Sequence, residues 1–140
     1  MTKITIGPTQ WQYNICNPPP PSPGSAYEGG YVICCSGGTR WIVAPSSTEV
    51  SRNWYNRNDT ITTANANAAC GDWFVPTRGQ LQNPGYTCRT YWDSHSSSHY
   101  WSSTECSSFS ACRVYFPNGY TSVENKSTTY PVRAFRCVTY

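Results

Sequence analysis

The sequence predicts one α+β domain with small antiparallel sheets, two to three short helices and long loops, held together by disulfides. β-rich runs lie near both ends, within residues 29–44 and 99–139, whereas segments with helix-start and alanine signals lie between them. A chain of 140 residues can bury one real core and is most simply one domain. Eight cysteines at wide spacing are a large number for this length and indicate disulfides formed in an oxidising environment.

The first 28 residues are expected to form an N-terminal arm and a proline-rich spacer outside the domain. Residues 2–16 alternate weakly between apolar and polar types, which favours an edge strand or an extended arm. Five prolines follow between Pro18 and Pro23, and such a run favours a semi-rigid polyproline II spacer or a plain connecting loop. The domain itself is expected to cover residues 29–140.

A β-hairpin is predicted at the start of the domain. GGYVICC (29–35) and RWIVA (40–44) are short β-rich runs, and the residues between them, Ser36-Gly37-Gly38-Thr39, favour a turn. The last strand, within YPVRAFRCVTY at the end of the chain, is expected to join this hairpin in one sheet.

Helical segments are predicted in the middle of the chain. Each begins with a Ser or Thr that can cap a helix, and each continues with apolar or alanine residues. They are expected at residues 45–55, 62–70 and 77–82. Thr62 or Thr63 is the expected cap of the second, and Asn83-Pro84-Gly85 ends the third.

The remainder is expected to be strand and loop, with a tight turn at Pro117-Asn118-Gly119. The large aromatic residues divide into two groups. Those within strand-like motifs are expected in the core: Trp41, Trp73, Phe74, Trp101, Phe116 and Phe135. Those nearer loops are expected either to form a Tyr/Ser/Asn-rich binding surface or simply to pack the loops: Tyr86, Tyr91, Trp92, Tyr100, Tyr120 and Tyr130.

Two disulfides are predicted. Cys70 and Cys137 would close a loop of about 67 residues between the middle helices and the last strand, which could add roughly 4 kcal/mol to stability. Cys106 and Cys112 would staple a small loop. No Cys-x2-Cys pair is present, so zinc ligation is not expected, and no metal or other cofactor is predicted.

Several motifs together resemble the C-type-lectin-like fold. More narrowly, they resemble the Legionella-collagen-like C-terminal lectin-like family, which occurs in bacterial surface proteins and in phage structural proteins. The matching segments lie in order between residues 29 and 140: WIVAP (41–45), the Ala-rich segment ending at Cys70, GDWFVPTRGQLQ (71–82), YWSSTE (100–105) and VRAFRCV (132–138). The resemblance implies a lectin-like fold, although fold alone does not decide function.

The resemblance does not extend to a calcium-dependent sugar site. Many C-type lectins hold calcium through Glu-Pro-Asn or Gln-Pro-Asp together with Trp-Asn-Asp, and this sequence has none of these motifs, because Glu124-Asn125 lacks the proline. We instead expect ligand contacts from loops near residues 86–99, 107–111 and 118–129. The candidate ligand-binding residues are Tyr91, Trp92, His95, His99, Tyr120, Glu124 and Asn125.

Other classes of function have little support in the sequence. A net charge of +3, without a basic cluster, gives little basis for nucleic-acid binding. No segment has the roughly 18 apolar residues needed for membrane insertion, and no signal peptide is visible at the start. The few carboxylates form no close pair for acid–base catalysis, so an enzyme is not expected.

These observations lead to three functional hypotheses. The first is a non-enzymatic bacteriophage virion surface protein, released by lysis, that binds a host cell-surface glycan or protein. The second is a purely structural capsid decoration or tail component whose tyrosine-rich loops contact neighbouring subunits. The third is a bacterial surface adhesin, which would require a secretion route. Under the first two, the partners are other virion proteins, and a homo-oligomer is expected.

Overall fold

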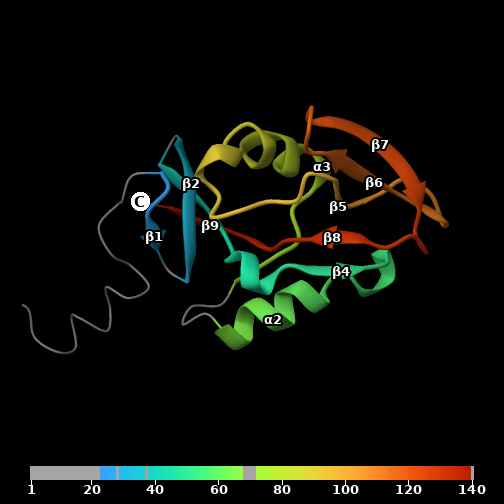
Figure 1. The fold of residues 1–140 in the computed structure, drawn as a ribbon, viewed down its shortest axis with the longest axis horizontal. Helices are drawn as coiled ribbons and strands as arrows, with labels where there is room; N and C mark the ends of the chain where they lie inside the picture. The colour runs from blue at the N-terminus through green and yellow to red at the C-terminus, as the bar shows by residue number, and fades with distance from the viewer. Residues whose placement is uncertain (1–22, 28, 37, 68–71, 140) are drawn as a thin grey trace, which may run out of the picture.

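The computed structural model describes residues 23–27, 29–36, 38–67 and 72–139, which form an α+β domain (Figure 1). The described strands form small antiparallel sheets. The first sheet has the order β1 (Ala26–Tyr27), β2 (Gly30–Ser36), β3 (Thr39–Val43) and β9 (Phe135–Thr139). The others pair β4 (Val50–Arg52) with β8 (Tyr130–Val132), and β5 (His99–Glu105) with β6 (Ser110–Tyr115) and β7 (Tyr120–Asn125). The α+β prediction is therefore confirmed.

Short helices and helical turns connect these strands. They are η1 (Ser46–Thr48), η2 (Trp54–Asn56), α2 (Asp59–Asn67), α3 (Arg78–Gln80), the π-type turn η3 (Leu81–Tyr86) and η4 (Arg89–Tyr91). None of the helices within the described ranges has the length and apolar character required to cross a membrane.

The predicted hairpin and its pairing with the last strand are both confirmed. β2 pairs with β3, and β3 pairs with β9, so the two ends of the domain meet in one sheet. β1 also joins this sheet through β2, although it precedes the predicted domain start at residue 29. The predicted arm at residues 1–22 lies outside the described residues. The predicted turn at 117–119 is confirmed, and Gly119 there has a left-handed φ of 77° that suits glycine.

The helix predicted over residues 45–55 is wrong. The chain makes only the turns η1 and η2 there, and Val50–Arg52 between them extends to pair with β8. A strand partner some 80 residues away therefore overrides the local helix-start signal. The second helix, α2, begins at Asp59, before the expected cap at Thr62 or Thr63, and the final residues predicted for it lie outside the described part.

The third helix begins as predicted. Thr77 caps α3 because its hydroxyl accepts a hydrogen bond from the backbone N–H of Gln80, while the Gln80 side chain accepts one from the N–H of Thr77. The helical geometry breaks at Asn83, within the predicted stop, and the chain then continues through the turn η3.

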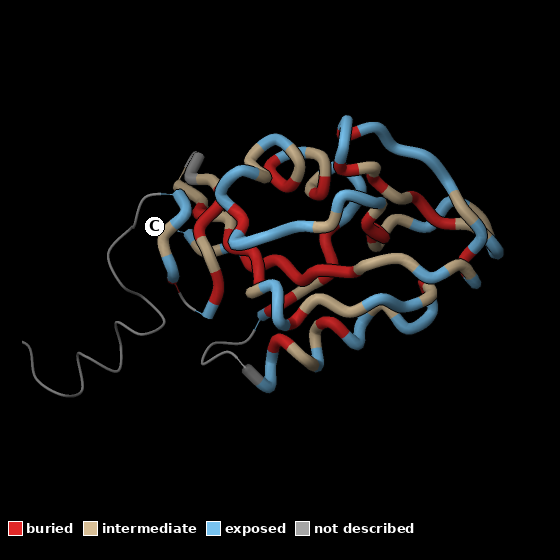
Figure 2. Tube along the Cα trace, in the orientation of Figure 1, coloured by how far each residue is buried: buried red, intermediate tan, exposed pale blue. Residues whose placement is uncertain are grey.

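Three clusters of buried side chains form the core between the sheets and helices. Figure 2 shows burial concentrated in the central strands, whereas β7 is exposed along most of its length. Of the predicted core aromatics, Trp73, Trp101, Phe116 and Phe135 are buried and Trp41 and Phe74 are half-buried. Trp92 and Tyr100, expected either at a loop surface or packed beneath the loops, are buried.

The buried position of Trp92 has a clear packing reason. Its ring lies 5.1 Å from the ring of Phe116 and 5.6 Å from those of Tyr100 and Phe135, measured between ring centroids. Edge-to-face contacts of this kind add to the gain from burial. The loop that carries Trp92 is thus anchored in the core, and Trp92 is not available as a surface ligand contact.

The two predicted disulfides have different outcomes. Cys106 and Cys112 are bonded, with their Cα atoms 6.3 Å apart. Cys70 lies outside the described residues, and Cys137 is an exposed free thiol on β9, an edge strand, so the structure does not bear out the predicted Cys70–Cys137 bond.

Candidate functional site

One face of the β5–β6–β7 sheet gathers aromatic and charged side chains. Because alternate residues of a strand point to opposite faces, the register separates the two sides of this sheet. The inner side carries buried residues such as Tyr100 and Val114. The other side, here called the outer sheet face, carries His99, Arg113, Tyr115, Tyr120, Ser122 and Glu124. The buried Trp101 and Ala111 lie on the same side, where Tyr130 of β8 packs against it. This sheet lies at the end of the domain away from the C-terminus (Figure 1).

Arg113 is the polar centre of the outer sheet face. Its Nε donates a 2.8 Å hydrogen bond to the hydroxyl of Ser122, and its Nη1 lies 3.3 Å from a carboxylate oxygen of Glu124. Nη1 also donates to the Tyr130 hydroxyl, and the guanidinium lies over the Tyr130 ring at 5.0 Å. Only 17% of the Arg113 side chain is exposed, so these contacts hold the guanidinium in a fixed orientation.

Aromatic rings surround this ionic centre. The ring of His99 lies 4.6 Å from that of Tyr115 and 5.4 Å from that of Tyr130. Tyr130 in turn covers the buried Trp101, with 5.2 Å between the ring centroids. Tyr120 stands directly opposite Tyr115 on the neighbouring strand and is 72% exposed. The outer sheet face therefore presents one largely free tyrosine ring beside half-buried rings.

The environment also fixes the charges of this face. Burial, and then the nearby charge of Arg113, lower the pKa of His99, and Glu124 opposes this only in part. A hydrogen bond from the backbone N–H of Asn125, with Arg113 among the further causes, lowers the pKa of Glu124. At neutral pH the face therefore combines a neutral imidazole with a carboxylate and a guanidinium.

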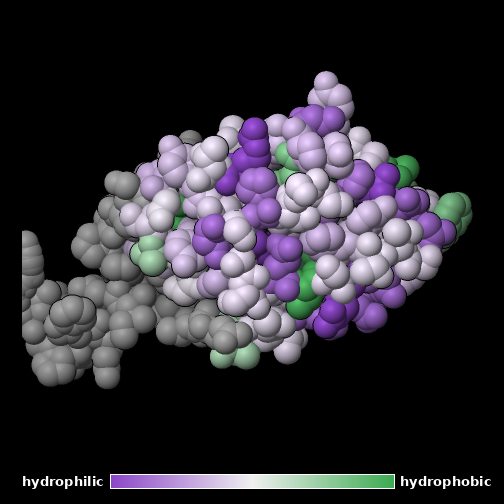
Figure 3. Space-filling model, in the orientation of Figure 1, coloured by the Kyte–Doolittle hydropathy of each residue, from purple (hydrophilic) through white to green (hydrophobic). Residues whose placement is uncertain are grey.

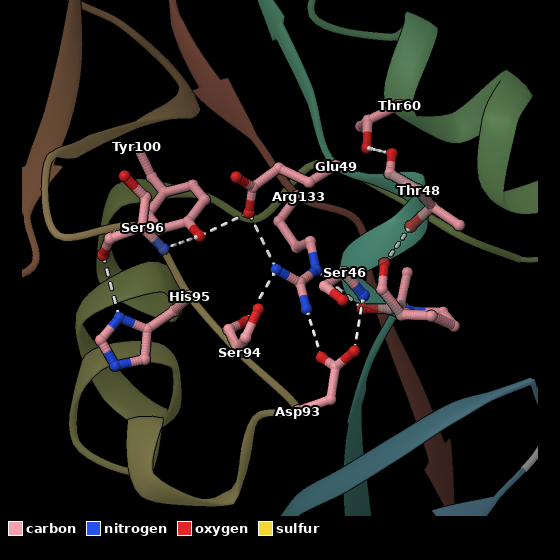
Figure 4. Close-up of polar contacts among 12 residues, drawn as sticks. Ser46, Thr48, Glu49, Thr60, Asp93, Ser94, His95, Ser96, Tyr100 and Arg133 are labelled. Carbon is pink, nitrogen blue, oxygen red and sulfur yellow. Dashed lines mark hydrogen bonds and ion pairs between the residues drawn. The ribbon is translucent and has the colours of Figure 1, made fainter.

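A buried arginine holds the loop that leads into β5. The side chain of Arg133 has no exposed area, yet it binds a carboxylate oxygen of Glu49 at 2.8 Å and one of Asp93 at 2.5 Å (Figure 4). It also donates to the carbonyls of Ala44 and Ser94. Figure 4 shows the guanidinium pointing between these groups, so a single side chain joins the 44–49 and 93–94 segments.

Further hydrogen bonds extend this network to β5. The hydroxyl of Tyr100 donates a 2.5 Å hydrogen bond to Glu49 and accepts one from the backbone N–H of Ser96. Burial alone would raise the pKa of Asp93. The hydrogen bonds from Ser46 and the charge of Arg133 outweigh burial, so that the Asp93 pKa is lowered. Hydrogen bonds therefore fix this loop on both sides just before His99, the first residue of β5.

The structure brings together only part of the predicted ligand-binding set. His99, Tyr120 and Glu124 lie on the outer sheet face. Asn125 follows Glu124 at the end of β7, where its side chain accepts hydrogen bonds from the backbone and hydroxyl of Ser127 and closes the turn. Tyr91, another predicted residue, does not lie on the outer sheet face. It lies on the exposed turn η4, which contacts β2.

His95 is also separate from the outer sheet face. It is exposed, and its ring lies against Trp92 and Phe116, at 6.1 Å and 5.4 Å between ring centroids. Residues 93–98 form no helix, so His95 and His99 do not share a helix face.

The sequence-based prediction missed Arg113, Tyr115 and Ser122. They lie in the strand-like run CRVYFPNGYTSVE (112–124), from which the sequence indicated only Tyr120 and Glu124 as ligand contacts. Period-two alternation places Arg113 and Tyr115 on one face of β6, and the turn at 117–119 sets Ser122 opposite Arg113. This alternation was the signal in the sequence that could have placed Arg113 and Tyr115 on one face.

Other features of the described surface are less distinctive. In the view of Figure 3, hydrophobic residues appear only as small separate patches on a mainly hydrophilic surface. Within the described ranges, no three His, Cys, Asp or Glu side chains are grouped so that they could hold a metal ion. Comparison of the sequence with protein-family models and with curated proteins finds no match.

Proposed function

We propose that this chain is a non-enzymatic, lectin-like binding protein of a bacteriophage virion, and that its outer sheet face binds a glycan on the host cell surface. The observation that carries the proposal is the grouping of an exposed tyrosine, half-buried aromatic rings and an oriented Arg113–Glu124 pair on one face. The motifs that resemble the lectin-like family support the class of protein and its C-type-lectin-like fold.

The chemistry of the outer sheet face suits a sugar. The ring of Tyr120, 72% exposed, offers a flat amphipathic surface on which the C–H face of a pyranose can stack. Arg113 uses Nε and Nη1 for its contacts within the protein, and a guanidinium carries two further donors on Nη2. Glu124 adds acceptor oxygens, so that sugar hydroxyls can be both donors and acceptors at this face.

The test is binding of the purified, oxidised protein to an array of bacterial surface polysaccharides and oligosaccharides. Tyr120→Ala removes the most exposed ring of the face and is expected to weaken binding at least tenfold. Tyr91→Ala, which removes a 45% exposed tyrosine on η4, is the matched control and should leave binding unchanged. If Tyr91→Ala abolished binding and Tyr120→Ala did not, the ligand site would lie on the η4 loop instead.

A second candidate is assembly with neighbouring virion subunits, and the exposure of β7 favours it. β7 is an edge strand that is exposed on both faces; Val123, on the side opposite to Tyr120, is 56% exposed. An edge of this kind can pair with a second strand. Sedimentation of the wild type and of Val123→Glu separates the two candidates, because only subunit contact through β7 predicts an oligomer that this charge dissociates.

A further inference from the structure

Two free cysteines from distant parts of the chain lie next to each other, beside the four-stranded sheet. Cys34 lies on β2, and Cys88 precedes η4, which together with η3 contacts β2. Both side chains are half-buried. This contact was not apparent from the sequence, because 53 residues separate the two positions along the chain.

An irregularity in β2 directs Cys34 toward Cys88. Val32 pairs with Ile42, but Cys34 pairs with Trp41, because the register shifts between Val32 and Cys34. Neighbouring residues of β3 point to opposite faces, so Cys34 points away from the face that Val32 occupies. In a regular strand, Val32 and Cys34 would point to the same face.

The face to which Cys34 turns is the one that Cys88 occupies. Its partner Trp41 and the bulged residue Ile33 belong to one hydrophobic cluster, and Cys88 packs against the same cluster. Val32 and Ile42 belong to a different one. Burial, and then the neighbouring Cys34, raise the pKa of Cys88 to about 11, which agrees with close contact between the two sulfurs.

We propose that Cys34 and Cys88 form a disulfide when the protein meets an oxidising environment. The oxidant is a small-molecule disulfide, such as oxidised glutathione. One cysteine thiolate attacks a sulfur of this molecule and expels one small thiolate, giving a mixed disulfide; the second cysteine thiolate then attacks the cysteine sulfur of that mixed disulfide and expels the other small thiolate. Two cysteine thiols and one small disulfide thus become one protein disulfide and two small thiols.

This bond would tie the η3–η4 segment covalently to the four-stranded sheet. The closed loop from residue 34 to residue 88 contains α2 and α3, so oxidation restricts a large part of the unfolded chain. Oxidation of this pair is expected to raise the Tm on the order of 10 °C above that of a variant lacking it.

Peptide mapping of the full chain tests the proposal. After treatment with oxidised glutathione, free thiols are alkylated and the protein is digested with trypsin, which releases residues 79–89 with Cys88 as its single cysteine. We expect this peptide to be linked to the peptide that contains Cys34. Since that peptide also carries Cys16 and Cys35, fragmentation and the variants Cys34→Ser and Cys35→Ser identify the partner.

The link is expected to persist in Cys35→Ser and in Cys137→Ser, which removes an exposed free thiol elsewhere, and to disappear in Cys34→Ser. Recovery of alkylated Cys88 from protein in which Cys106–Cys112 has formed would overturn the proposal. So would a link from Cys88 to any cysteine other than Cys34. Both readouts come from the wild-type chain, so they do not depend on a variant folding.

Discussion

Replacing Arg133 with methionine tests whether the buried network holds the domain together. Methionine keeps an apolar stem beside Trp92 but removes the charge that binds Glu49 and Asp93. The variant therefore removes the Arg133 hydrogen bonds to two carboxylates and two carbonyls, while little of the side-chain packing is lost; Glu49 keeps its bond from Tyr100 and Asp93 its bond from Ser46.

The expected cost can be worked from the exposure of these groups. Removing one partner of a fully buried ion pair costs about 3–5 kcal/mol. Glu49 and Asp93 keep 23% and 20% of their side-chain exposure, so water can compensate for part of the loss. We therefore expect Arg133→Met to lower the free energy of unfolding by about 3 kcal/mol, the lower end of that range.

Urea denaturation at neutral pH, followed by tryptophan fluorescence, measures this change. The matched control is Arg52→Met, which removes the exposed ion pair with Asp59, whose side chains are 43% and 52% exposed. That control should cost less than about 1 kcal/mol. Equal destabilisation by Arg133→Met and Arg52→Met would contradict the expected effect of burial.

Two further predictions concern a turn and a titrating group. Gly119→Ala is expected to lower the free energy of unfolding by about 2 kcal/mol, because φ is +77° and the new Cβ would lie 2.5 Å from the Tyr86 ring. Gly79→Ala, with open space around the new Cβ, should be neutral or slightly stabilising. Equal changes in stability for both variants in thermal denaturation would contradict this. Because the folded-state pKa of His99 is lowered by burial and by Arg113, the unfolded chain takes up a proton first, so stability should fall as pH drops below about 6.5. His99→Gln should flatten the stability profile between pH 6.5 and 5, before the carboxylates titrate, and an unchanged slope would contradict the assignment.

Local signals in the sequence predicted the elements that depend on local contacts. The hairpin at β2 and β3, the cap at Thr77 and the turn at Gly119 all follow from residues within a few positions of one another. The helix predicted over residues 45–55 is wrong for the opposite reason, because Val50–Arg52 is stabilised as a strand by β8, far along the chain.

The candidate site shows the same division. His99, Tyr120 and Glu124 were predicted from their place near loops, whereas Arg113 and Tyr115 became apparent only once the register of β6 was known. Sequence alone could not show that Trp92 would be buried, because its packing partners come from separate strands and turns. Nor could it pair Cys34 with Cys88, because the direction of Cys34 depends on an irregularity in β2.

The most direct test of the central proposal is binding of the labelled, oxidised protein to a panel of intact bacterial cells, with and without soluble cell-surface glycans. We expect saturable binding that a soluble glycan competes away and that Tyr120→Ala weakens, while Tyr91→Ala leaves it unchanged. Folded protein that binds none of the cells, or cell binding that no glycan reduces and that does not depend on Tyr120, would contradict a glycan-binding role for the outer sheet face.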